Sequence, residues 1–153
     1  MTIRRASPAD AEAILDAHIA SILGVCAPDY SPEQISAWVS PKNAAQYIRA
    51  MTGGHLMWVA EDTGRVLGFV DLVGDMLEGL YVHPGAIGKG IGRRLLETAE
   101  QAARAAGYRR LELYSTLTSY RFYMHMGYEP LGPGDFRPGG VDVPCVHMRK
   151  FLR

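Results

Sequence analysis

The chain has 153 residues, and its 16 Lys and Arg residues balance 16 Asp and Glu residues, so the formal net charge is zero. This balance argues against general nucleic-acid binding by bulk electrostatics. No apolar run approaches the ~18 residues of a membrane span, and the N-terminal residues lack the apolar core of a signal peptide. The length suits a single domain over residues 1–153. The two cysteines form no CxxC pair and suit a cytoplasmic protein.

The N-terminal third is predicted to hold one strand and three helices. A short strand is expected over residues 3–5. Serine followed by proline is typical of a helix start, because the hydroxyl caps the helix and proline at the first position loses no needed donor. This pair predicts three helices, beginning at Ser7, Ser31 and Ser40, of which the first ends near Gly24.

The middle and C-terminal parts are predicted to be mostly sheet, with two helices. The expected strands cover residues 56–61, 65–73, 76–83, 110–115 and 145–152, and the expected helices residues 90–106 and 119–126. Residues 132–140 are rich in proline and glycine and are expected to form a mobile loop. This order of elements indicates a mixed α/β sheet.

Glycine-rich turns that open helices bind phosphates, and the chain contains one such turn. An apolar strand over residues 80–84 is followed by Gly88, Gly90 and Gly92 and then by a long amphipathic helix. Unpaired N–H groups at a helix start attract phosphate oxygens. The spacing matches neither a Walker loop nor a dinucleotide fingerprint. The segment therefore predicts a phosphorylated cofactor of another kind.

Two segments resemble the GCN5-related N-acetyltransferase (GNAT) family. Residues 80–96 are similar to its acyl-CoA-binding segment, Gln/Arg-x-x-Gly-x-Gly/Ala after a strand, with Gly90 and Gly92 at the small positions and Ile87 at the Gln/Arg position. Residues 118–128 resemble its Asn-Ala-x-x-Phe-Tyr-x-x-x-Gly-Phe segment, with Thr118 in place of asparagine.

The resemblance implies a fold and a cofactor. The fold expected is α/β, with a mixed, mostly antiparallel sheet that splays between the fourth and fifth strands and helices on both faces. The cofactor expected is acetyl-CoA, whose pantetheine arm adds to the fourth strand as a further strand would. The implied cofactor-binding residues are Leu80, Tyr81, Val82, Ile87, Gly88, Lys89, Gly90, Ile91, Gly92 and Arg93.

The resemblance also implies an activity, the transfer of an acetyl group to a primary amine of a small molecule by direct attack in a ternary complex. Tyr123 matches the tyrosine of the Phe-Tyr pair and is the expected general acid, although it could instead pack between helix and sheet. Glu78 is the expected base, with Asp71 and Asp75 as rivals; a Glu78 that faces solvent at a strand end is the other interpretation.

An aromatic pocket for the acceptor is expected from the first helices. Its predicted residues, each of which could instead belong to the core, are His18, Cys26, Tyr30, Trp38 and Tyr120. No metal-ligand spacing occurs among the histidines, so no metal is predicted. The expected partner is a small-molecule amine, and a homodimer is left open. Two alternatives also stay open: a non-catalytic acyl-CoA-binding sensor or interaction module, and an acetyltransferase of protein N-termini.

Overall fold

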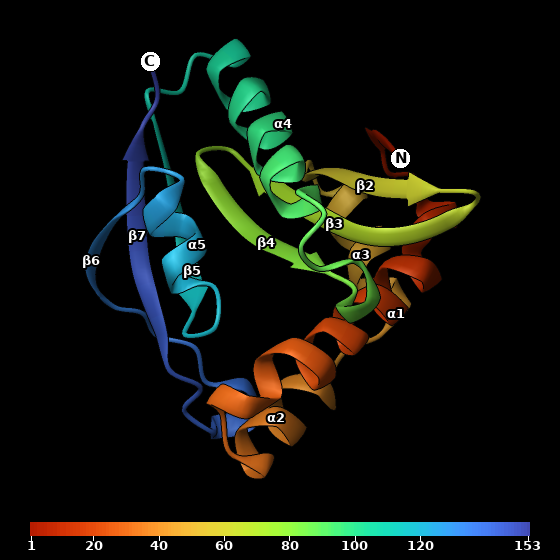
Figure 1. Cartoon of the computed structure of the whole chain (residues 1–153), viewed down its shortest axis with the longest axis vertical. Coiled ribbons are helices and arrows are strands. Elements are labelled where there is room, and N and C mark those ends of the chain that lie inside the picture. The colour runs from red at the N-terminus through yellow and green to blue at the C-terminus, as the bar shows by residue number, and fades with distance from the viewer.

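A computed structural model describes all residues of the chain, and Figure 1 labels its elements. Seven strands and five α-helices follow one another in the order β1 (Thr2–Arg5), α1 (Ala11–Ser21), α2 (Pro32–Val39), α3 (Ala44–Thr52), β2 (Leu56–Asp62), β3 (Arg65–Val73), β4 (Met76–Val82), α4 (Ile91–Ala105), β5 (Arg110–Thr116), α5 (Tyr120–His125), β6 (Glu129–Pro133) and β7 (Cys145–Phe151).

The strands form one sheet in the order β1-β2-β3-β4-β5-β7-β6. All neighbouring pairs are antiparallel except β4 and β5, which are parallel. These two strands pair only through Met76 with Glu112 and Leu77 with Leu113. Beyond Leu77 they diverge, as Figure 1 shows. The prediction of a mostly antiparallel sheet that splays between the fourth and fifth strands is confirmed.

A β-bulge in β4 marks the point where the strands separate. Leu72 of β3 pairs with Leu77, and the preceding residue, Asp71, pairs with Gly79. Glu78 is therefore the extra residue on β4. A bulge bends its strand and re-aims the side chain that it inserts, so the bend at Glu78 accounts for the loss of β4–β5 pairing immediately after Leu77.

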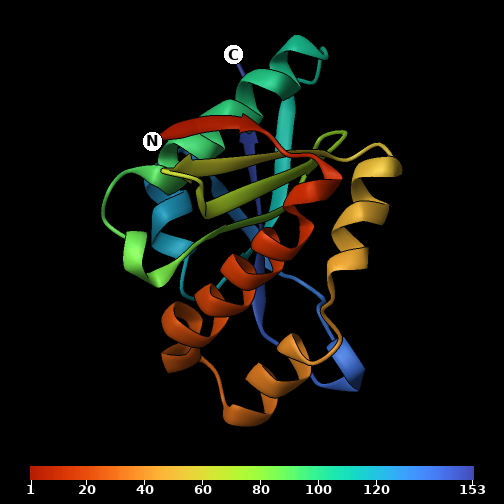
Figure 2. The same cartoon turned by 90° about the vertical axis from the view of Figure 1, so that its right-hand side faces the viewer.

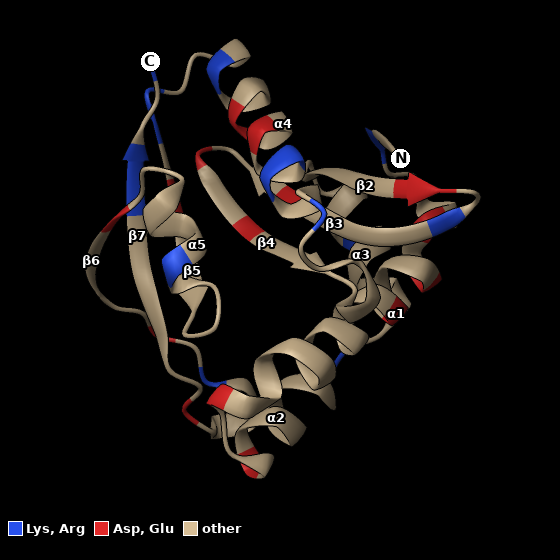
Figure 3. Ribbon diagram, in the orientation of Figure 1, with Lys and Arg blue, Asp and Glu red and all other residues tan.

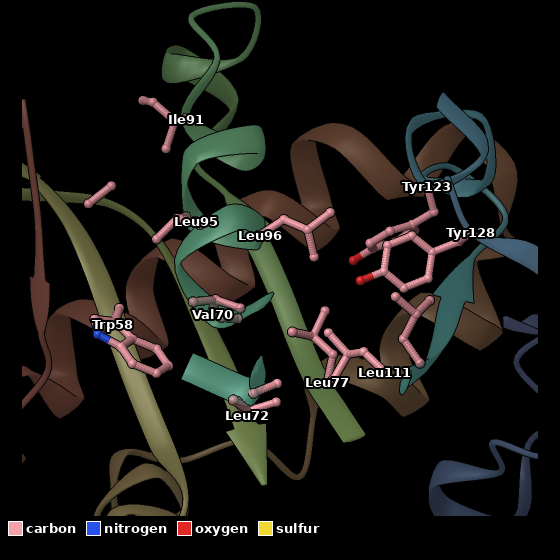
Figure 4. Packing of buried hydrophobic residues seen from close by; sticks show 14 of the residues in the cluster. Trp58, Val70, Leu72, Leu77, Ile91, Leu95, Leu96, Leu111, Tyr123 and Tyr128 are labelled. Atoms are coloured by element: carbon pink, nitrogen blue, oxygen red, sulfur yellow. The ribbon is translucent and has the colours of Figure 1, made fainter. Parts of the chain in front are cut away.

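Helices cover both faces of the sheet (Figure 2). On one face, α1 packs on β3 and beside α3, and a cluster that includes Ile14, Val59 and Phe69 is buried between them. On the other face, α4 packs across β2, β3 and β4. Figure 4 shows Leu95 and Leu96 of α4 directed at the strands, in the same core cluster as Tyr123 of α5.

The first helix runs further than predicted. A 3-10 turn over Pro8–Asp10 leads into α1, and the helical path continues through a π-helical turn, Ile22–Cys26, and a 3-10 turn, Ala27–Asp29. The expected end near Gly24 is wrong, because this glycine lies within the π turn. By length and composition alone, the run Pro8–Asp29 could cross a membrane, and in this structure its α1 part packs against the sheet.

Two further boundaries differ from the prediction. The third helix begins after Asn43, whose side chain accepts a hydrogen bond from the Gln46 N–H in a capping box, so Ser40 is not its cap. The predicted loop over residues 132–140 overlaps an additional strand, β6, which pairs with β7 at the edge of the sheet. Pro130 and Pro133 concealed this strand in the sequence, because proline is tolerated in strands mainly at an edge.

Candidate active site

A cavity of about 370 Å³ lies where β4, the turn before α4 and the start of α5 meet. We call it the loop-side cavity. Its wall contains most of the predicted cofactor-binding residues and both residues of the Phe122-Tyr123 pair. The full lining is Ser21, Val25, Cys26, Leu80, Tyr81, Val82, Ala86, Ile87, Gly88, Gly90, Ile91, Gly92, Arg93, Thr118, Ser119, Phe122 and Tyr123.

Free backbone N–H groups gather at the mouth of the loop-side cavity. The N–H groups of residues 88–93 donate to no carbonyl or side chain of the chain. Gly90 caps α4 in the left-handed region, with φ +77°, and Gly88 has φ +84°. A Cβ at either glycine would meet nothing within 4 Å, so both face open space. Such a row of donors at the positive end of a helix fits a diphosphate.

The edge of β4 that β5 leaves uncovered supplies further backbone groups. The His83 N–H bonds to the Leu67 carbonyl of β3. Because successive strand residues direct their backbone groups to opposite sides, the Tyr81 groups also face β3, whereas those of Leu80 and Val82 face the side from which β5 has departed. This free edge suits a strand-like ligand, and Leu80, Tyr81 and Val82 all line the loop-side cavity beside it.

The π-helical turn after α1 closes one side of the loop-side cavity. Gly24 lies against the loop after β4, and a Cβ there would sit only 2.5 Å from the Pro84 ring. Glycine thus permits the close approach that brings Val25 and Cys26 to the cavity wall. Burial raises the pKa of the Cys26 thiol to about 11, so this thiol is protonated at neutral pH.

A narrow opening between β4 and β5, the strand gap, begins where their pairing stops. Glu78 and Tyr123 both line it, together with residues on either strand. Tyr123 is buried, its hydroxyl bonds to no other residue, and burial raises its pKa. Its ring packs against that of Tyr128, which Figure 4 shows beside it. Leu80, Tyr81 and Tyr123 line both the strand gap and the loop-side cavity.

A second cavity of about 370 Å³ opens on the other side of the strand gap. We call it the aromatic cavity, because six of its lining residues carry aromatic rings. Glu78, Tyr81, Tyr114 and Thr116 line both this cavity and the strand gap. The full lining is His18, Tyr30, Trp38, Lys42, Glu78, Tyr81, Tyr114, Thr116, Asp135, Phe136, Val143, Pro144 and Cys145.

His18 is a buried polar residue of the aromatic cavity. Its Nδ1 lies 2.8 Å from the Tyr47 hydroxyl, and its ring lies tilted against the Tyr81 ring, with the ring centroids 4.0 Å apart. Its Nε2 is buried and has no hydrogen-bond partner. Burial, followed by the positive charge of Lys42, holds the His18 pKa well below its ordinary value, so the imidazole is neutral at pH 7.

Tyr30 and Trp38 form the floor of the same cavity. The Tyr30 hydroxyl donates to the Pro144 carbonyl at 2.7 Å and accepts from the Leu117 N–H at 2.9 Å. Both hydrogen bonds of the Tyr30 hydroxyl are thus made within the protein. The Tyr30 ring lines the cavity, with its centroid 5.3 Å from that of the Trp38 ring. These bonds fix the connection between α1 and α2 against the end of β5.

The remaining predicted residues lie elsewhere. Tyr120 packs against the core beside α4 and lines neither cavity. Cys26 lines the loop-side cavity rather than the aromatic one, and Lys89 is exposed on the loop. Of the rival bases, Asp71 bonds to His55 at 2.8 Å, and Asp75 lies in the β3–β4 turn at the paired end of the strands.

Sequence reasoning missed several lining residues. Lys42 was assigned to the third helix but lies in the connection before it. Asp135 and Phe136 fall in the segment expected to be a mobile loop, yet they form part of the cavity wall. For Lys42 the capping box of Asn43 and Gln46 was an available signal, because it excludes the preceding residues from the helix.

Charge is spread evenly over the molecule. Figure 3 shows acidic and basic residues scattered across the helices and the sheet, with no large region of one sign on the face that it presents. No group of three or more His, Cys, Asp or Glu residues is arranged to hold a metal ion. The distinctive features of the site are thus its free amides, the strand gap and the two cavities.

Comparisons with known proteins agree with this geometry. The model of the acetyltransferase (GNAT) domain family matches residues 26–152. An IAA acetyltransferase of Azospirillum brasilense is 41% identical over 76 residues, which are 48% of this chain and 48% of that protein. An uncharacterised N-acetyltransferase of Escherichia coli (strain K12), YjgM, is 32% identical over 109 residues, 64% of this chain and 65% of that protein. The chain thus spans between about half and two thirds of the length of these relatives.

Solved structures share the complete fold. A GCN5-related N-acetyltransferase from Rhodopseudomonas palustris superimposes with a TM-score of 0.93 and 30% identity over 99% of this chain and 95% of that one. A phosphinothricin acetyltransferase from Sinorhizobium meliloti, in complex with acetyl-CoA, superimposes with a TM-score of 0.74 and 25% sequence identity, over 99% of this chain and 88% of that one. PaiA N-acetyltransferase from Thermoplasma acidophilum, in complex with coenzyme A, superimposes with a TM-score of 0.79 over 98% of both chains. At 24% sequence identity, this match shows a shared fold. The chain belongs to the GNAT family of acetyltransferases.

Proposed function

We propose that this enzyme acetylates the primary amine of a small molecule, which enters the aromatic cavity and attacks directly in a ternary complex. The observation that carries the proposal is the strand gap. It shares lining residues with both the loop-side cavity and the aromatic cavity, and the two candidate proton-transfer residues, Glu78 and Tyr123, both line it. An acceptor on one side therefore has a short path to a thioester on the other.

The chain's contribution to acetyl-CoA binding is mainly backbone. Bound acetyl-CoA supplies a thioester whose carbonyl carbon an amine attacks without a nucleophile from the protein. The N–H groups of residues 88–93 would hold its diphosphate, and the free backbone of Leu80 and Val82 would orient the pantetheine arm. Arg93, which pairs with Glu97 at 2.9 Å on the exposed face of α4, adds a positive charge beside the cavity.

Tyr123 is the proposed proton donor toward the departing thiolate. Because burial raises its pKa, the phenol stays protonated through neutral and mildly alkaline pH. A phenol of raised pKa is a weaker acid than a thiol, so it stabilises a developing thiolate chiefly by donating a hydrogen bond. A hydroxyl without a partner in the protein is suited to this role.

Glu78 is the proposed base. Glu78, the extra residue of the β-bulge, is exposed and lines both the strand gap and the aromatic cavity. From there it can accept a proton from the acceptor's ammonium group, directly or through water. Asp71 already bonds to His55, and Asp75 lies at the closed end of the strands, which favours Glu78 over both.

The aromatic cavity favours a small acceptor. A volume of about 370 Å³ is within the range of small-molecule sites, and rings from several elements line it. This favours a small molecule over a protein N-terminus, and membership of an enzyme family favours catalysis over acyl-CoA sensing. The cytoplasmic location stays a prediction, and the sequence favours neither a monomer nor a homodimer.

Release of free thiol from acetyl-CoA across a panel of primary amines tests the proposal. We expect turnover with part of the panel, and we expect Tyr123→Phe to lower kcat about 100-fold. Coenzyme A affinity, measured by calorimetry, should change little, since only one hydroxyl is removed. Tyr120→Phe is the matched control, because it removes a hydroxyl from the same helix away from both cavities.

Two results would contradict the proposal. Coenzyme A binding without turnover on any amine would indicate that the site does not catalyse small-molecule acetylation. Equal kcat values for the wild type and Tyr123→Phe would remove Tyr123 from the mechanism.

A further inference from the structure

Lys42 brings an uncompensated cation into the aromatic cavity. The residue lies between α2 and α3, lines the cavity and forms no ion pair or hydrogen bond through its ammonium group. Burial lowers its pKa to about 8, and no carboxylate is close enough to raise it again. Half-buried ammonium groups without a partner are costly to desolvate, so this corner of the cavity favours an anion.

His18 offers a second polar group in the same cavity. Its Nδ1 is held by the Tyr47 hydroxyl at 2.8 Å, which leaves the buried Nε2 as the only ring nitrogen available to a ligand. When the phenol donates to Nδ1, the neutral imidazole carries its proton on Nε2 and can itself donate. Lys42 and His18 line the same cavity, where one bound anion could meet both groups.

Two carboxylates, those of Glu78 and Asp135, also line the aromatic cavity. Glu78 lies at the strand gap, and Asp135 lies near Cys145 at the end of β7 that faces the cavity. Neither carboxylate is paired with Lys42. The cavity therefore has a carboxylate at the strand gap, an ammonium group outside that gap, and the contacting rings of Trp38 and Phe136 in its lining.

We propose that the acceptor is a zwitterionic amine of amino-acid type, with its carboxylate bound by Lys42 and His18, its ammonium group facing Glu78, and an apolar side chain against the aromatic rings. This inference rests on the proposed function, because it names the substrate class of the same site. A free amino acid with a side chain the size of methionine or phenylalanine is the simplest molecule with this arrangement, and one anion satisfies both otherwise unpartnered groups.

Matched substrate pairs test the inference. L-methionine and L-phenylalanine are compared with their carboxamides, which keep the amine and the side chain but lack the negative charge. We expect Lys42→Met to lower kcat/KM for the acids by about 10-fold or more, mostly through KM, and to leave the amides nearly unchanged. Taking the ratio of variant to wild type for each substrate cancels the different amine pKa values of acid and amide.

Two controls keep the comparison specific. Arg49→Met removes a cation from the exposed surface of α3 and should alter neither substrate series. His18→Asn keeps a group for the Tyr47 hydroxyl but loses the Nε2 donor, and we expect a smaller loss, again confined to the acids. Circular dichroism confirms that each variant is folded before its kinetics are read.

Calorimetry on the coenzyme A complex separates this inference from the proposed function. If acids bind through Lys42 without turnover, the substrate class stands and the catalytic proposal fails. If amides are acetylated and acids neither bind nor react, the catalytic proposal stands and the inference is overturned. Equal losses for acids and amides in Lys42→Met also overturn it, as does the absence of any binding by the acids.

Discussion

Glu78 is itself the extra residue of the β-bulge in β4. The bulge lies directly after Leu77, the last residue of β4 that pairs with β5, and Glu78 lines the gap that opens there. The sequence shows that Glu78 falls within a strand, but it does not show that this strand contains a β-bulge at that residue. The bulge therefore supplies both the opening and the group that we propose as the base.

Replacing Glu78 with glutamine tests this assignment. The amide keeps the size of the side chain but cannot accept a proton, so kcat/KM should fall about 100-fold while coenzyme A affinity is retained. Asp75→Asn is the control, since it changes the same kind of group in the turn before β4, outside the strand gap and the aromatic cavity. Steady-state kinetics would refute the assignment if the two variants behaved alike.

His18 makes the stability of the protein depend on pH. Its pKa is held below the ordinary value of 6.5 in the folded state, so only the unfolded chain takes up this proton as the pH falls. The contribution of His18 to folding is complete above pH 6.5 and is lost progressively below it, by at most about 1.4 kcal/mol per pH unit. Urea unfolding over a pH series should show this slope in the wild type.

The variant His18→Asn should flatten that slope, whereas His125→Asn, at an exposed position of α5, should leave it as it is. Unchanged slopes in both variants would mean that the imidazole titrates in the folded protein as it does in water.

Among the elements, the turn before α4 offers a possible diphosphate site through its backbone N–H groups rather than through side chains. Its sequence departs from the family pattern at Ile87, which is exposed at the rim of the loop-side cavity. The free N–H groups of residues 88–93 do not depend on that side chain. This explains how the site can fit a diphosphate despite the departure.

The variants Gly90→Ala and Gly107→Ala distinguish the effect of backbone strain on stability from an effect on coenzyme A binding. Both glycines have φ values in the left-handed region, +77° and +90°, and a Cβ at either would meet nothing within 4 Å. Each substitution should therefore cost about 1 kcal/mol of stability. Only Gly90→Ala, at the N-terminal end of α4, should also weaken coenzyme A binding, by about 10-fold.

Calorimetry and urea unfolding on the two variants check this prediction. Gly107→Ala, beyond the other end of the same helix, should bind coenzyme A as the wild type does. Equal affinities in the two variants would show that the amides near Gly90 do not hold the diphosphate.

For the whole molecule, local patterns predicted the elements well and tertiary contacts poorly. The Ser31 capping box, the turn before α4 and the alternation of the strands are written in neighbouring residues, and they appear where expected. The π turn around Gly24 depends on contact with Pro84, which is sixty residues away in the chain. No local pattern encodes such an approach.

The same limit applies to the site. Strand β4 and the turn after it could be assigned by resemblance, because their residues are contiguous. The aromatic cavity draws its walls from α1, α2, their connections, β4, β5 and the segment before β7, so its membership follows only from packing. Lys42 and Asp135 were missed for this reason, and Tyr120 was included although it packs into the core.

The central claim is that acetyl-CoA and the acceptor occupy opposite sides of the strand gap. A crystal structure with coenzyme A and an N-acetylated amino acid tests it most directly. We predict that the diphosphate lies on the N–H groups of residues 88–93, the sulfur beside Tyr123, and the acetylated product in the aromatic cavity with its carboxylate at Lys42. Coenzyme A bound away from these amides, or both ligands on one side of the gap, would contradict the account.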